Sequence, residues 1–78
     1  MALHNLKIIS GRACIKILCK EFGFVEIRQK GSHIILKKTT PFGDIGTVVP
    51  DHKELKIGTL KGILELAKVS ESEFAKFL

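Results

Sequence analysis

The stretch FVEIRQKGSHIILKKT, residues 24–39, decides the fold because it has the pattern of a β-hairpin. Two runs rich in Val, Ile and Phe flank Gly31 and Ser32. Glycine at the first central position is typical of a two-residue turn of type II′. A three-residue turn would shift the register and place His33 among apolar neighbours, which a half-buried hairpin disfavours. We therefore expect the two-residue turn.

This turn gives the hairpin one apolar and one polar face. It pairs residues whose numbers add up to 63, which places Glu26 directly opposite Lys37. The apolar face collects Val25, Ile27, Gln29, Ile34, Leu36 and Lys38. The polar face collects Phe24, Glu26, Arg28, Lys30, His33, Ile35 and Lys37. We expect the first face to lie on the core and the second, with His33, to stay open to solvent.

The segment before the hairpin predicts a helix. Ser10 is an N-cap residue, and Gly23 is suited to the left-handed conformation that ends a helix. The apolar residues between them form a broad stripe. The three cations on this helix, Arg12, Lys16 and Lys20, recur every four residues and so form one basic row.

After the hairpin, TPFGD (40–44) predicts a turn and IGTVVP (45–50) a third strand that stops at proline. TLKGILELAK follows as a second helix capped by Thr59. A capping box of Ser70 and Glu73 predicts a short last helix that ends near Leu78. The expected fold is α+β, with the element order αβββα. A three-stranded antiparallel sheet would carry two helices on one face, plus the short C-terminal helix.

The 78 residues suffice for one small domain, and we expect residues 1–9 to be a loosely packed start. No apolar run is long enough to span a membrane and the start does not resemble a signal peptide, so we expect a cytoplasmic protein. Cys14 and Cys19 lack the spacing of a metal or redox motif, and we interpret them as small apolar fillers.

Charge is distributed unevenly along the chain. The net charge is +5. Residues 1–38 carry eight Lys and Arg against two acidic residues, a net of +6, whereas residues 39–78 carry five against six. Solubility would explain a basic protein, but the asymmetry indicates a surface that binds a polyanion.

His33 is the one ionisable group on the expected open face whose ordinary pKa, about 6.5, is near neutrality. Cleavage of RNA without a metal requires a base for the 2′-hydroxyl proton and cations for the phosphate. His33 with Arg28, Lys30 and Lys37 would supply both. The alternative is that His33 is an ordinary surface residue. His52, in the loop after the third strand, either donates the second proton or caps a backbone group.

A second basic group surrounds the start of the helix that follows that loop. Free N–H groups and the positive end of the helix dipole favour a phosphate there. Its members are Lys53, Lys56 and Lys61. Together with the basic row of the first helix, they would resemble the way two helices and a loop hold double-stranded RNA, or they form a solvated basic face. No metal cluster or glycine-rich nucleotide loop is apparent, so no cofactor is expected.

Three elements in order make the sequence resemble the HicA family of toxins from toxin–antitoxin pairs. They are RQKGSH (28–33), VPDH (49–52) and KELKIGTLKGIL (53–64), and the likeness extends from about Ser10 to Phe77. It implies a double-stranded-RNA-binding-like fold and ribosome-independent mRNA cleavage that inhibits translation. It also implies an antitoxin partner, HicB, that covers the active face.

The resemblance places the family's catalytic histidine on His33 and its second histidine on His52, and it places the turn glycine on Gly31. Two departures concern structure. Ile57 replaces a frequent proline, which would loosen the start of the second helix. Lys68 replaces a frequent glycine, so that helix would run on or lack a left-handed cap.

Two other functions compete with the endoribonuclease interpretation. An RNA-binding module would repress by occupancy and cut nothing, so substitution of His33 would change little. Alternatively, the open face is mainly a protein-binding surface, with Phe24 and Ile35 as apolar anchors. An acidic partner would suit its charge.

Overall fold

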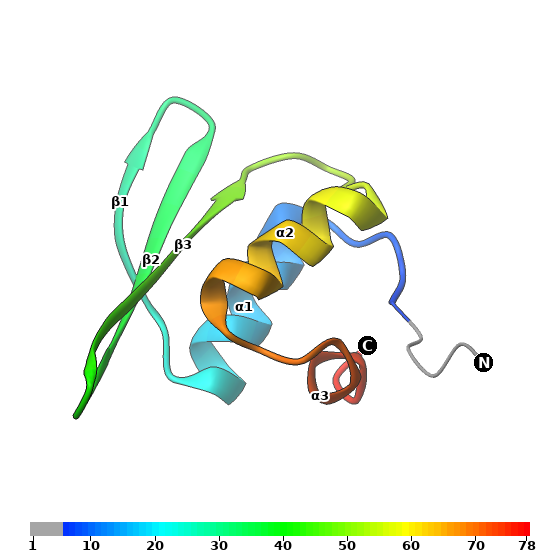
Figure 1. Ribbon diagram of the computed structural model, residues 1–78. Helices are drawn as coiled ribbons and strands as arrows, with labels where there is room; N and C mark the ends of the chain where they lie inside the picture. Colours follow the sequence, from blue (N-terminus) through cyan, green and yellow to red (C-terminus); the bar gives the residue numbers. More distant parts are fainter. Residues whose placement is uncertain (1–5) are drawn as a thin grey trace.

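The computed structural model describes residues 6–78 as a sheet covered on one face by helices (Figure 1). The elements follow the order α1 (Gly11–Phe22), β1 (Val25–Lys30), β2 (His33–Thr40), β3 (Gly43–Pro50), α2 (Ile57–Ala67) and α3 (Glu71–Ala75). The sheet is antiparallel, with β2 in the centre. The predicted α+β class and αβββα order are confirmed.

The first helix has both of the predicted end signals. The Ser10 hydroxyl accepts a hydrogen bond from the Ala13 N–H at 3.0 Å. Gly23 ends the helix in the left-handed region, with φ 80°, and its N–H donates to the Leu18 carbonyl. These caps satisfy backbone groups that a helix leaves unpaired at its ends.

The core lies between the sheet and the helices. Its largest buried side chains come from every layer: Phe24, Phe74, Leu18, Ile34, Leu36, Leu55, Leu60, Leu64 and Val49. Leu6 and Ile9, from the start expected to be loose, pack against this core, while residues 1–5 lie outside the described part. In addition, the buried Thr47 hydroxyl of β3 donates to the Ile63 carbonyl of α2 at 2.9 Å.

The hairpin has the predicted turn but not the predicted register throughout. Lys30 pairs with His33, and Gly31 has φ 60° as the two-residue turn requires. A β-bulge between Glu26 and Arg28 then shifts the pairing by one residue. Glu26 therefore lies opposite Leu36, and the expected pairing of Glu26 with Lys37 is wrong.

The bulge also reverses which side chains of this segment enter the core. Phe24, expected on the open face, is only 2% exposed, whereas Val25 and Ile27, expected in the core, are 57% and 49% exposed. The physical reason is size, because burying a phenyl ring removes more apolar surface from water than burying valine. The proposal that Phe24 anchors a protein partner is thereby excluded.

The second helix begins earlier than expected. Lys56, not Thr59, is its N-cap residue, without a capping side chain, and the Lys56 carbonyl accepts from the Leu60 N–H at 2.9 Å. Burial of Leu55 and Leu60 on either side of this first turn explains the earlier start. Ile57 is the first helical residue, the position where proline is common.

The far end of α2 keeps a left-handed cap although it lacks glycine. Lys68 has φ 58° and ψ 38°, and its N–H donates to carbonyls of the last turn. Both expected alternatives, that the helix would run on or that it would lack a left-handed cap, are wrong. Ser70 then caps α3 by accepting from the Glu73 N–H at 3.1 Å, as predicted. Phe74 and Phe77 contact Phe22, which joins α3 to the end of α1.

Candidate active site

His33 is the first residue of β2, between Lys30 of β1 and Pro50 of β3. Its neighbours Ile34 and Leu36 are fully buried, and successive strand residues point to opposite faces. His33 therefore lies on the uncovered face of the sheet, and its side chain is exposed. This is the placement that the two-residue turn predicted.

Three predicted cations share this face with His33. Lys30 is its direct cross-strand partner, and Arg28 pairs with Ile35, the next residue on the same face. Lys37 follows on β2, and its ammonium lies 3.2 Å from the Asp44 carboxylate of β3. The structure thus brings together a titratable imidazole and cations, all exposed.

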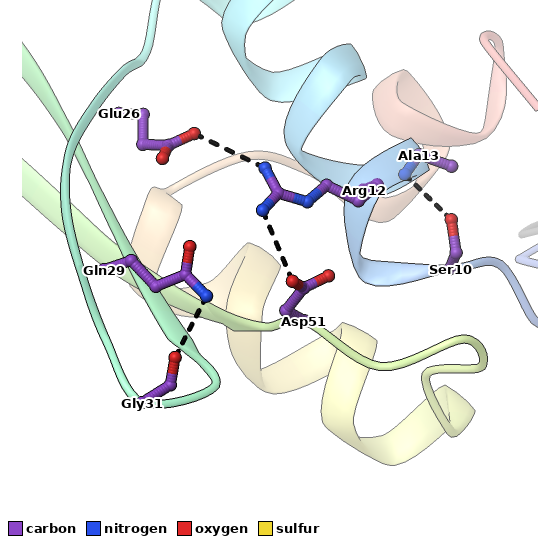
Figure 2. A network of polar contacts seen from close by, with 7 residues as sticks. All are labelled: Ser10, Arg12, Ala13, Glu26, Gln29, Gly31 and Asp51. Atoms are coloured by element: carbon purple, nitrogen blue, oxygen red, sulfur yellow. Dashed lines mark hydrogen bonds and ion pairs between the residues drawn. The ribbon is translucent and has the colours of Figure 1, made fainter.

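The turn that precedes His33 is tied to the loop after β3. The Ser32 carbonyl accepts a hydrogen bond from the Asp51 N–H at 2.6 Å. The Gln29 side chain donates to the Gly31 carbonyl at 3.0 Å (Figure 2). Both bonds restrict the end of the hairpin at which His33 lies.

His52 lies in the loop that leads from β3 to α2, and its side chain is exposed. Its backbone, not its ring, binds the neighbouring helix, because the Gly11 N–H of α1 donates to the His52 carbonyl at 2.8 Å. The imidazole makes no hydrogen bond within residues 6–78, so the structure does not assign it a backbone-capping role.

Arg12 differs from the other predicted cations because two carboxylates already bind it (Figure 2). Its guanidinium lies 3.3 Å from Asp51 and 3.8 Å from Glu26. Sequence reasoning did not identify either acid as a partner. The one hint in the sequence was an acidic residue, Glu26, within an otherwise basic hairpin. Only the bulge shows that its side chain points toward Arg12.

The remaining predicted cations belong to the helix layer and not to the open face of the sheet. They are exposed and comprise Lys16 and Lys20 on α1, Lys53 and Lys56 before α2, and Lys61 within it. The structure therefore divides the predicted phosphate-binding residues between two regions, and only one of them contains His33.

Neither cysteine has the properties of a reactive thiol. Burial raises the pKa of the Cys14 thiol to about 12. Burial and the nearby negative charge of Glu26 also raise the pKa of Cys19. Because the thiolate is the nucleophilic form, both side chains are suited to packing.

The fold and this face define a small basic α+β protein with one histidine among cations on an uncovered sheet. A family model described as the HicA toxin of bacterial toxin–antitoxin systems matches residues 11–69. The chain belongs to this family, and it is the toxin of a toxin–antitoxin pair, which implies an antitoxin partner. No curated protein and no solved structure matches the chain. No helix within residues 6–78 is long and apolar enough to cross a membrane.

Proposed function

We propose that this toxin is an endoribonuclease that cleaves mRNA without a metal or a ribosome and thereby inhibits translation in the cytoplasm. Membership of the toxin family supports the proposal. The observation that carries it is the position of His33, exposed on the open face directly opposite Lys30. A base that must reach an RNA strand needs such access.

The reaction is an attack of the RNA on itself. His33 takes the proton of a ribose 2′-hydroxyl, and the resulting oxygen attacks the adjacent phosphorus. The bond from phosphorus to the 5′-oxygen breaks, and that oxygen takes up a proton. The products are a 2′,3′-cyclic phosphate and a 5′-hydroxyl. His52 is the residue to test as the donor of the second proton.

The cations beside His33 would hold the phosphate that reacts. Arg28 offers a planar fork of N–H groups suited to two phosphate oxygens, and Lys30 offers a compact charge. Lys37 shares its charge with Asp44 and would contribute less. These groups stabilise the negative charge that grows on the phosphate as the new bond forms.

The helix-layer cations would hold the RNA backbone away from the reacting phosphate. Lys56 lies directly before α2, where free N–H groups and the helix dipole favour an anion. Lys16 and Lys20 of α1 are also exposed and would add further cations of the helix layer. Contacts to the backbone provide affinity without reading sequence.

The antitoxin is proposed to be a HicB-type protein that covers the open face of the sheet. Half-buried Ile35 and exposed Val25 and Val48 provide apolar contacts there, surrounded by cations. An acidic partner would fit this surface, and its association should slow as salt rises. Such a partner would block access to His33.

The decisive experiment compares the parent protein with His33→Ala on a long RNA in EDTA. We expect cleavage by the parent and at least about a 100-fold slower rate for the variant, since a general base contributes about that much. The 5′ ends of the products should carry hydroxyl groups. Thr39→Ala is a matched control, because Thr39 lies on the same face of β2 and is exposed. Circular dichroism and RNA affinity should agree among all three proteins.

Three outcomes would contradict the proposal. Cleavage that requires a divalent ion, or that leaves a 5′-phosphate, would exclude this mechanism. Equal RNA binding by parent and variant with cleavage by neither would favour the alternative, a module that represses by occupying RNA. That alternative is supported by the His33 ring, which has no hydrogen-bond partner within residues 6–78 to orient it.

A further inference from the structure

Strand β1 is the least supported element of the sheet. All six of its residues are exposed, so no side chain of β1 is buried in the core. It pairs with β2 only, and it lies at an edge. Within residues 6–78, the one ion pair that joins β1 to the helix layer is that of Glu26 with Arg12. Strand β1, which carries Arg28 and Lys30, therefore has little apolar anchoring of its own.

The β-bulge makes this ion pair possible. Without it, the alternation of the strand would place Glu26 on the open face, opposite Lys37. The shift of one residue instead places Glu26 opposite Leu36, which is fully buried on the helix side. Bulges commonly redirect a side chain near functional sites. Here the redirected carboxylate lies 3.8 Å from Arg12.

Arg12 also binds the opposite side of the hairpin end. Its guanidinium lies 3.3 Å from the carboxylate of Asp51, the residue that follows β3. The backbone N–H of Asp51 in turn donates to the Ser32 carbonyl, next to His33. Figure 2 shows the guanidinium between the two carboxylates. One side chain of α1 thus contacts both segments that flank the strand bearing His33.

We propose that Arg12 is a positioning residue, which holds the His33 hairpin against α1 through Glu26 and Asp51 and does not itself bind RNA phosphate. The catalytic part of this inference rests on the proposed function. Its consequence is a fixed distance between the cations around His33 and the phosphate-binding cations of the helix layer. A small displacement of catalytic groups lowers the rate even when substrate still binds.

Removal of the two acids distinguishes positioning from phosphate binding, because the two roles predict opposite changes in the cleavage rate. Glu26→Gln and Asp51→Asn each remove a negative charge from a surface that would bind RNA. If the charges acted on RNA alone, both variants would bind more tightly and cleave at least as fast. If they hold Arg12, both should lower kcat about threefold or more while KM stays equal or falls.

The arginine variants complete the comparison. Arg12→Gln should lower kcat to a similar extent, and combining it with Asp51→Asn should add little, because the same contact is lost. Arg12→Lys should restore part of the rate, since an ammonium keeps the charge but not the planar fork. Equal folding is expected, because exposed ion pairs contribute little to stability.

A matched control is the exposed ion pair of Lys76 and Glu73 on the C-terminal helical segment, whose atoms lie 3.0 Å apart. Lys76→Gln and Glu73→Gln should leave kcat and KM unchanged. An increase in KM alone for Arg12→Gln, together with a smaller salt dependence of RNA binding, would show that Arg12 contacts phosphate and would overturn the inference.

Amide hydrogen exchange tests the tether without any catalysis. Residues 25–33 should exchange about fivefold faster in Arg12→Gln, Glu26→Gln and Asp51→Asn than in the parent, whereas α2 should not change. Unchanged exchange in all three variants would refute the inference, whatever the rates. If the parent cuts no RNA, the proposed endoribonuclease fails, and exchange alone then decides whether Arg12 positions the hairpin.

Discussion

At the scale of single residues, Lys68 has the least favourable backbone in the described part of the chain. It is the one non-glycine residue there with positive φ, at 58°. A side chain with a Cβ disfavours this left-handed region by about 1–2 kcal/mol. Two contacts nevertheless hold the residue there. Its N–H donates a hydrogen bond to the last turn of α2, and the next residue, Val69, is partly buried against the core.

We expect Lys68→Gly to stabilise the protein by about 0.5–1 kcal/mol. Glycine removes the Cβ conflict, and this gain exceeds the greater entropy that glycine gives to the unfolded chain. Urea unfolding followed by circular dichroism would measure the change. Lys68→Ala is the control, since it removes the ammonium but keeps the Cβ and should gain nothing. Equal stabilisation by both variants would show that the lysine charge, not the backbone, is unfavourable.

At the scale of elements, the sequence predicts what local rules determine. The Gly31-Ser32 turn and the ends of α1 depend on nearby residues, and they were predicted correctly. The bulge depends on a competition between Phe24 and Val25 for the core and on Arg12, which is distant in sequence. Strict alternation of faces cannot show that competition. It therefore misplaced Phe24 but not His33, whose cross-strand partner Lys30 lies on the turn side of the bulge.

The same limit applies to the junction between α1 and the loop after β3. Gly11 approaches so closely that a Cβ placed on it would lie 2.0 Å from the Pro50 carbonyl oxygen. Its N–H also donates to the His52 carbonyl. In the sequence, Gly11 is a poor helix former directly after a cap residue, and nothing local indicates a tertiary contact. The contact brings Arg12 to Asp51.

We expect Gly11→Ala to destabilise the protein by about 2 kcal/mol or more, because backbone atoms must move to admit the methyl group. Gly62→Ala is the matched control within α2. A Cβ on Gly62 would meet nothing within 4 Å, so alanine should stabilise by about 0.5–1 kcal/mol. The midpoints of urea unfolding would measure both changes. A gain for both variants would mean that α1 moves away from Pro50 without cost.

At the scale of the whole molecule, the two basic regions lie on different layers. Residues 1–38 provide the cations of both α1 and the hairpin, which explains the charge asymmetry of the sequence. The order of elements and the exposure of His33 could be predicted from this sequence. Which cations are available to a ligand could not, because the partners of Arg12 are distant in sequence and the pairing of Lys37 with Asp44 depends on how β2 and β3 lie together.

Salt dependence of RNA binding tests which cations meet phosphate. Each phosphate contact to single-stranded RNA releases counterions and contributes about −0.7 to the slope of log K against log salt. Lys30 lies opposite His33 and makes no ion pair within the described residues, so Lys30→Gln should reduce the slope by about 0.7. Lys76→Gln removes the same charge from the molecule, but Glu73 lies 3.0 Å from that ammonium, and the slope should not change.

Filter binding to a cleavage-resistant RNA with 2′-methoxy groups, between about 50 and 200 mM salt, would give both slopes. Equal reductions for the two variants would mean that net charge alone attracts RNA and that the face around His33 makes no specific phosphate contact.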